Sequence, residues 1–158
     1  MSIKLGPTGH TDTFARDTLP PPDMWPEIAL GIHEYPDHIN VGVELTDRMV
    51  EAGFGDHTAL IGNGRRRSYK ELADWTNRIA RTLVEDYGVK PGNRVLIRSA
   101  NNPAMVACWL AATKAGAVVM NTMPMLRSGE LAKIVDKAQV TVALCDTRLM
   151  DEMILCAK

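Results

Sequence analysis

The 158-residue chain contains few of the features that mark membrane, secreted or disulfide-bonded proteins. It has three cysteines (Cys108, Cys145 and Cys156) and no CxxC pair, which excludes both a disulfide framework and a common type of zinc site. No apolar run approaches the ~18 residues of a membrane span, and the beginning of the chain lacks a signal-peptide pattern. We therefore expect a cytoplasmic protein in which Cys108 and Cys145, set in apolar runs, are small core residues.

The chain also lacks an excess of charge of either sign. Lys and Arg number 18 against 19 Asp and Glu, for a formal net charge of −1, so the composition predicts no nucleic-acid partner. One dense basic run, Arg65-Arg66-Arg67, could contact a phosphate, but a hairpin with solvated arginine side chains is the simpler interpretation.

Motifs of nucleotide, nucleophilic and metal chemistry are missing from these residues. There is no GxGxxG, no GxxxxGK[ST], no GxSxG and no HExxH. The acidic pair Asp151-Glu152 is expected to solvate a helix face. The sequence therefore assigns no catalytic residue and no metal ligand, and the four histidines are interpreted as structural or solvent-facing: His10, His33, His38 and His57.

The chain divides into two parts. Residues 1–40 show little periodicity and contain Pro20, Pro21, Pro22 and Pro26, which favour an extended path because each fixes φ and disfavours helix before it. We interpret this part as an extended N-terminal arm laid over a domain surface, with Phe14, Trp25 and Tyr35 as apolar anchors. Residues 41–158 have regular patterning and form the α/β part.

The first half of the α/β part predicts helix, hairpin and helix. Ser68 followed by Glu71 indicates a capping box at the start of the second helix, and Gly88 indicates its end. We expect a short helix from Val43 that ends at Gly53 and a second helix that continues through Tyr87. Between them we expect a hairpin, with strands at 57–61 and 66–69 around the turn Gly62-Asn63-Gly64.

The second half predicts a parallel sheet. Apolar strands at 95–97, 117–120 and 140–144 alternate with helices at 104–114 and from 128, which is the pattern of right-handed βαβ crossovers. Asn102-Pro103 is a typical helix start, and the helix that follows is apolar almost all round, so Trp109 is expected inside. The chain stops within a further apparent helix, which indicates a truncated unit.

The segment PGNRVLIRSANNPAMVACWLAATKAGAVVMNTMPMLRSGEL resembles the N-terminal region of acyl-CoA synthetases of the adenylate-forming superfamily. The likeness covers residues 43–153, and it includes SYKELADWTNRIARTL. The arm sequence HTDTFARDTLPPPDMWP is similar to the branch that handles benzoate and 2-aminobenzoate. The resemblance implies that the fold is the N-terminal portion of the large domain of such an enzyme.

The resemblance also implies a two-step reaction in the full-length protein. Mg-ATP and a small aromatic carboxylate would give an acyl-adenylate and diphosphate, and coenzyme A would then displace AMP. The family's phosphate loop, ribose ligand and C-terminal lysine are not in this sequence, so the isolated chain is expected to be inactive and to bind ATP, Mg²⁺ and coenzyme A weakly at best. Some relatives place a basic residue directly after the proline that Pro124 matches, where it can approach a phosphate of coenzyme A. Here Met125 stands at that position, and Arg127 is the candidate for this contact, with a solvated arginine beside the third helix as the alternative.

Two other interpretations remain open. The chain could be a stand-alone, non-catalytic binding or interaction module of the same fold, or part of an adenylation domain that loads a carrier protein. In the leading interpretation its partner is the remainder of the same enzyme, with neither nucleic acid nor membrane involved, and the exposed sheet makes self-association an expectation.

Overall fold

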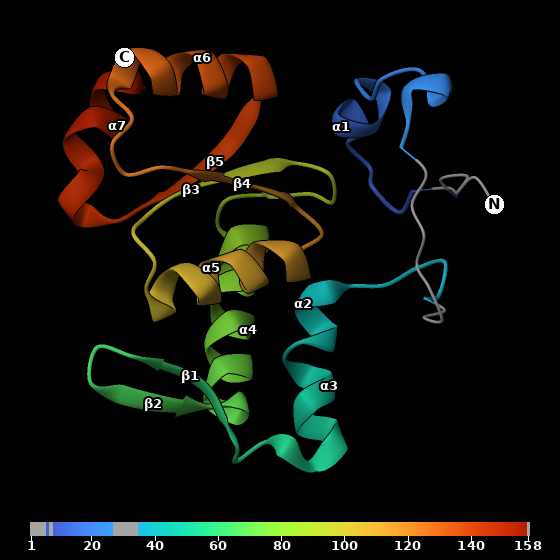
Figure 1. Ribbon diagram of the computed structural model, residues 1–158, viewed down its shortest axis with the longest axis vertical. Coiled ribbons are helices and arrows are strands. Elements are labelled where there is room, and N and C mark those ends of the chain that lie inside the picture. The colour runs from blue at the N-terminus through green and yellow to red at the C-terminus, as the bar shows by residue number, and fades with distance from the viewer. Residues whose placement is uncertain (1–5, 7, 27–34, 158) are drawn as a thin grey trace.

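A three-stranded parallel sheet lies at the centre of the protein, as the computed structural model shows (Figure 1). The structure describes residue 6 and residues 8–26 and 35–157. The strands β3 (Arg94–Arg98), β4 (Val118–Thr122) and β5 (Val140–Cys145) pair in the order β4-β3-β5, with both pairings parallel. This confirms the α/β class and the parallel sheet.

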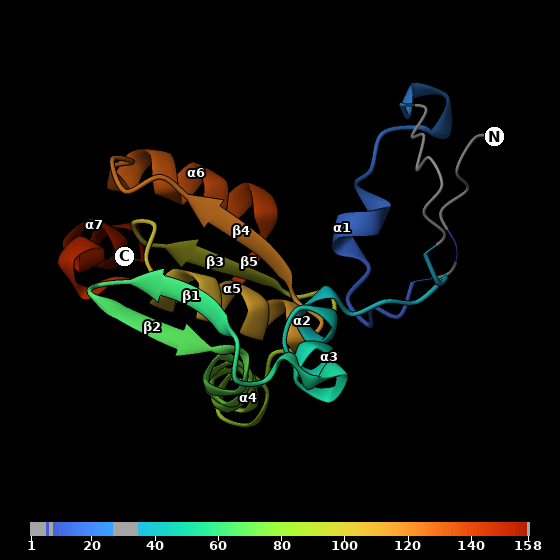
Figure 2. The ribbon, with the colours of Figure 1, turned by 60° about the horizontal axis from the view of Figure 1, so that its bottom comes forward.

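The two crossovers cover opposite faces of the sheet. Helix α5 (Pro103–Lys114) joins β3 to β4, and α6 (Ser128–Ala138) joins β4 to β5 on the other side of β3. Because right-handed crossovers in opposite directions use opposite faces, α5 and α6 lie on different sides of the sheet, as Figure 2 shows. The 3₁₀ turn η3 (Thr147–Leu149) leads into α7 (Met150–Cys156), which packs beside α6.

The core has two apolar clusters, both on the α5 side. One joins Val95 of the central strand to residues of α4, α5 and the loops: Leu83, Val89, Ala112 and Ala117. The other comprises Leu72, Ala107 and Leu110, between α5 and α4. Trp109, predicted to lie inside, is half-buried: it packs against this second cluster but is not part of its fully buried centre.

Helix starts follow the capping residues seen in the sequence. Helix α4 (Tyr69–Glu85) begins at Ser68, whose Oγ accepts from Glu71 N (3.2 Å), while Glu71 Oε2 accepts from Ser68 N (2.8 Å). At the start of α5, Asn102 Oδ1 accepts from Met105 N (2.9 Å). Both predicted caps are confirmed, and each satisfies backbone donors that helix geometry leaves free.

The predicted hairpin is present beside α4. Strands β1 (Thr58–Gly62) and β2 (Arg65–Ser68) pair antiparallel, and the turn residues Asn63 and Gly64 have φ of 52° and 70°. Positive φ at both positions is typical of tight two-residue hairpins. The basic run at residues 65–67 forms the return strand.

Residues 41–54 form three short pieces, where the sequence predicted one helix. They are α2 (Val41–Glu44), α3 (Asp47–Met49) and the π turn η2 (Val50–Phe54). Thr46, fully buried between the first two, donates its hydroxyl to Gly42 O (2.5 Å), a local bond that competes with a continuous helix. Asn40 Nδ2 donates to Lys114 O (3.1 Å) and fixes this segment to the end of α5.

The arm is not extended throughout, in contrast to the prediction. Its described part forms the short helix α1 (Phe14–Asp17) and the 3₁₀ turn η1 (Pro22–Met24). Trp25 folds back locally, because its Nε1 donates to Pro20 O (2.7 Å). The remaining arm residues of the prediction, 1–5, 7 and 27–34, with His33 among them, lie outside the described residues.

Candidate functional site

The carboxyl ends of the three parallel strands bring three loops together: residues 99–102 after β3, 123–127 after β4 and 146–149 after β5. In open parallel sheets, ligands bind at this edge, where neighbouring strands lead to helices on opposite faces. Strand β3 leads to α5 on one face, whereas β5 leads to α7, which packs with α6 on the other. The boundary between β3 and β5 is therefore one switch point of this sheet, and the boundary between β3 and β4 is another, because β4 leads to α6.

Arg98 organises two of these loops. Its side chain is almost fully buried at the end of the central strand, with 1% of the residue exposed. Its guanidinium donates to four backbone carbonyls at 2.8–3.4 Å: Met123 O, Pro124 O, Leu126 O and Leu149 O. A buried cation is costly unless its donors are satisfied. These bonds fix the loop after β4 and the start of α7 relative to each other.

A hollow of about 460 Å³ opens beside this cluster. Its lining includes three arginines from three different segments, Arg98, Arg127 and Arg148, together with the acidic residues Asp151 and Glu152. Two of the arginines already have carboxylate partners: Arg127 Nη1 lies 2.9 Å from Glu152 Oε1, and Arg148 forms two bonds to Asp146 at 3.0 and 2.6 Å. The four hydrogen-bond partners of the Arg98 guanidinium are all carbonyls, which carry no net charge. Of the three arginines, Arg98 therefore contributes most to the positive potential at the hollow, because no carboxylate in the described part of the chain pairs with it.

Arg127, the sequence candidate for a phosphate contact, lies on the rim of this hollow. Its side chain is 78% exposed, and Met125 is also largely exposed at the position directly after Pro124. A phosphate that binds Arg127 would have to displace the Glu152 carboxylate from it. Because Arg127 is exposed, and Glu152 keeps its hydrogen bond from Ser128 N, that exchange costs little. The contact itself stays a prediction.

Glu152 has a more specific position than a solvated helix face. Its carboxylate accepts from Ser128 N (2.8 Å) at the start of α6, as well as from Arg127. The hydrogen bond from Ser128 and then that from Arg127 hold the pKa of Glu152 below its ordinary value. The sequence interpretation missed this contact because Glu152 and Ser128 lie far apart in the chain.

A second hollow, of about 360 Å³, lies at the boundary between β3 and β5. Its lining includes Ile97, Leu144 and two thiols, Cys108 and Cys145, both half-buried. Burial raises the pKa of each thiol, so both are protonated at neutral pH and are weak nucleophiles. The cysteines serve here as small apolar groups in a partly open wall.

Residues 6, 8–26 and 35–157, which the structure describes, contain neither a metal-binding cluster nor a membrane-spanning helix. No three His, Cys, Asp or Glu side chains within those ranges gather to hold a metal ion. No helix in the same part of the chain is long and apolar enough to cross a membrane.

In the basic run, Arg65 pairs with Glu71 (2.7 Å) and Arg67 lies over the Trp75 ring at 4.6 Å, while Arg66 is exposed.

The sequence interpretation missed the two buried arginines of β3. Arg94 and Arg98 flank the apolar triplet Val95-Leu96-Ile97. Considered without its neighbours, this strand suggests that both arginines lie in solvent at its ends. A signal was available: residues four apart on a strand share a face, and a central parallel strand is covered on both faces. Two arginines at that spacing must therefore find partners inside the protein.

Comparison with protein families identifies the chain. The model of the AMP-binding enzyme family matches residues 48–157. The chain belongs to this family. Part of the chain is also similar to two curated proteins: crotonobetaine/carnitine–CoA ligase of Salmonella paratyphi A, with 33% identity over 104 residues, and salicylyl-CoA synthase / salicylate adenylyltransferase of a Streptomyces species, with 32% identity over 125 residues.

These similarities cover 63% and 68% of this chain but only 20% and 22% of the two relatives, so the chain spans about a fifth of their length. Among solved structures, a benzoate CoA ligase from Burkholderia xenovorans LB400 superposes with a TM-score of 0.69 at 20% identity, over 76% of this chain and 24% of that one. The superposition confirms the fold as the N-terminal portion of an adenylate-forming enzyme's large domain.

Proposed function

We propose that this chain is the N-terminal part of an ATP-dependent aryl-CoA ligase that converts an aryl carboxylate, ATP and coenzyme A to aryl-CoA, AMP and diphosphate. The family match over residues 48–157 carries the general reaction. The aryl preference is supported by the salicylyl-CoA relative and by the arm sequence at residues 10–26. The crotonobetaine/carnitine relative supports the alternative of an aliphatic acid.

The residues present fit only a small share of this chemistry. Transfer of a phosphoryl or adenylyl group needs cations and backbone donors around the phosphates, and Mg²⁺ needs oxygen ligands. This chain contains no phosphate-loop motif. We therefore assign no catalytic step to it, and we propose that ATP and Mg²⁺ bind mainly to the remainder of the enzyme.

Coenzyme A is the cofactor toward which this chain has a candidate contact. Phosphate groups bind well to arginine because its planar guanidinium donates two hydrogen bonds at once. We propose that Arg127 contacts a phosphate of coenzyme A, and that the positive charge of Arg98 at the same hollow supports binding. In this proposal Glu152 is the partner that Arg127 releases.

A panel of acids tests the aryl proposal. The longest natural form of the protein would be assayed for thioester formation with benzoate, 2-aminobenzoate, salicylate, crotonobetaine and carnitine, with ATP and coenzyme A. We expect the three aromatic acids to react and the other two not to. Turnover of only crotonobetaine or carnitine would contradict the aryl assignment and leave the ligase class intact.

The Arg127 contact has its own test in the same assay. Arg127→Ala should raise the KM for coenzyme A about tenfold, which corresponds to about 1.4 kcal/mol, and leave the KM for ATP unchanged. Arg66→Ala is the matched control, since Arg66 is an exposed arginine on the remote strand β2. An unchanged KM for coenzyme A would remove Arg127 from the site without affecting the proposed reaction.

A further inference from the structure

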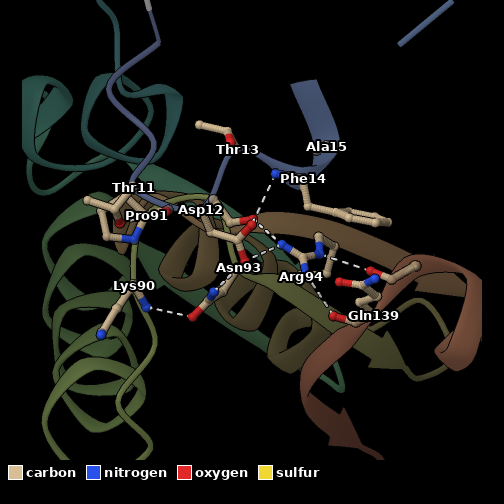
Figure 3. Close-up of polar contacts among 12 residues, drawn as sticks. Thr11, Asp12, Thr13, Phe14, Ala15, Lys90, Pro91, Asn93, Arg94 and Gln139 are labelled. Carbon is tan, nitrogen blue, oxygen red and sulfur yellow. Dashed lines mark hydrogen bonds and ion pairs between the residues drawn. The ribbon is translucent and has the colours of Figure 1, made fainter. Parts of the chain in front are cut away.

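The arm is joined to the amino end of the central strand through one carboxylate (Figure 3). Asp12 Oδ2 accepts from Arg94 Nη1 (2.5 Å) and from Asn93 Nδ2 (2.8 Å), while its Oδ1 accepts from Phe14 N (3.1 Å). Arg94 is 6% exposed in its side chain, and Asp12 is 27% exposed. The hydrogen bond from Arg94, followed by that from Phe14, lowers the pKa of Asp12, so the carboxylate is charged at neutral pH.

Backbone and ring contacts extend this junction on both sides of Asp12. The amides of Thr11 and Asp12 both donate to Pro91 O, at 3.1 and 3.0 Å. The ring of Phe14 lies against the Arg94 guanidinium, 4.7 Å from its central carbon to the ring centroid. Gly92, with φ of 92°, allows the arm to pass, because a side chain there would collide with the Asp12 carbonyl.

Arg94 does not depend on the arm for its own hydrogen bonds. Arg94 Nε donates to Ala138 O (2.9 Å), Nη1 to Gly92 O (2.9 Å) and Nη2 to Gln139 O (3.0 Å). Each guanidinium nitrogen therefore keeps a carbonyl partner if Asp12 leaves. Removing one partner of a buried ion pair usually also leaves hydrogen-bond donors of the other partner unsatisfied. Here the three carbonyls still accept from all three nitrogens of the Arg94 guanidinium and hold the side chain in place.

We propose that Pro91, Asn93 and Arg94 form a preformed socket for an acidic peptide segment with an aromatic residue two positions after its carboxylate. Residues 11–14 of the arm are its ligand within the same chain, and they detach and rebind while the parallel sheet stays folded. The socket lies at the amino end of β3, at the opposite end of the strand from the loops and hollows of the candidate site. The proposal is therefore independent of the proposed ligase function.

Native-state hydrogen exchange on the whole 158-residue chain tests detachment. The amides of Thr11 and Asp12 report on the socket, and those of Leu96 and Ile97 report on the sheet. In Asp12→Asn, we expect exchange at residues 11 and 12 to rise at least tenfold, after correction for intrinsic rates, and exchange at 96 and 97 to change less than twofold. Asp17→Asn is the matched control and should leave all four rates unchanged, because within the described residues the Asp17 carboxylate accepts a hydrogen bond from Thr13 (2.7 Å) and none from the socket.

Two outcomes would overturn detachment. Equal acceleration of the arm and strand amides would show one cooperative unit, and no acceleration in Asp12→Asn would show that the carboxylate does not hold the arm.

Recognition is tested by adding a synthetic peptide of residues 8–17 to the Asp12→Asn chain. We expect the Arg94 Nε–H resonance to shift at millimolar peptide and not to shift with the same peptide carrying Asp12→Asn. Equal responses, or none, would overturn the socket.

Discussion

Arg94 and Arg98 lie four residues apart on the same face of β3, and they hold opposite ends of helix α6. Arg94 donates to Ala138 O and Gln139 O, where α6 ends, and Arg98 donates to Met123 O, Pro124 O and Leu126 O, just before α6 begins. The crossover helix is thus fixed to the central strand at both ends by side chains of that strand. This arrangement explains how a fully covered strand tolerates two charges.

Arg98→Met should destabilise the protein by roughly 3 kcal/mol, because the change removes the donor shared by four carbonyls while keeping most of the side-chain volume. Urea unfolding at neutral pH measures it. Arg66→Met is the control, since the exposed Arg66 should contribute less than about 0.5 kcal/mol. Equal effects of the two substitutions would show that the Arg98 bonds do not stabilise the fold.

Gly42→Ala should destabilise the contact between α2 and α5. A Cβ at Gly42 would lie 2.6 Å from Leu110 O and 2.8 Å from Lys114 N, so the short helix α2 must move away. We expect a loss of about 1–3 kcal/mol, as for other overpacked sites. Gly129→Ala is the matched control: it also lies in a helix, nothing lies within 4 Å of its added Cβ, and it should stabilise by roughly 0.5–1 kcal/mol. A stabilising Gly42→Ala would contradict the packing described.

Asp47 should make unfolding pH-dependent in the acid range. Burial by itself would raise the pKa of Asp47, but hydrogen bonds from Lys114, Thr46 and Asn77 outweigh it, and the pKa is lowered from 3.8. A carboxyl group with a lowered pKa stabilises the folded state above its unfolded value and loses that contribution as the pH falls through the folded value. Below about pH 4, the free energy of unfolding should therefore decrease with falling pH, and the decrease should be smaller in Asp47→Asn than in the unmodified chain. Urea titrations from pH 6 to pH 2.5 measure the difference, and parallel profiles would exclude Asp47 as a contributor.

Local signals were sufficient for most of the secondary structure. The caps at Ser68 and Asn102 were predictable because the residues that form each cap lie within four positions of one another in the sequence. The strands were predictable to within one or two residues at each end: β1, β3, β4 and β5 extend beyond the predicted end, and β2 ends one residue before it. The polar flanks Arg94 and Arg98 belong to β3 because their partners come from distant loops, which no local pattern reveals.

The contacts around the sheet ends were less predictable. Asp12 binds Arg94 across 82 positions and Glu152 binds Arg127 across 25, so neither pair follows from spacing. Trp109 was misplaced because a helix that is apolar almost all round does not show which side faces the sheet. Arg127 was placed in the correct loop by resemblance, and its ion pair with Glu152 is visible only in three dimensions.

Exchange of labelled diphosphate into ATP tests the central claim most directly. The isolated 158-residue chain would be compared with the longest natural form of the protein, each with benzoate, 2-aminobenzoate or salicylate and Mg²⁺. We predict acid-dependent exchange by the longer protein and none by the isolated chain, because these residues contain no phosphate-loop motif. Exchange above the no-protein level by the isolated chain, in a preparation free of longer forms, would contradict the account.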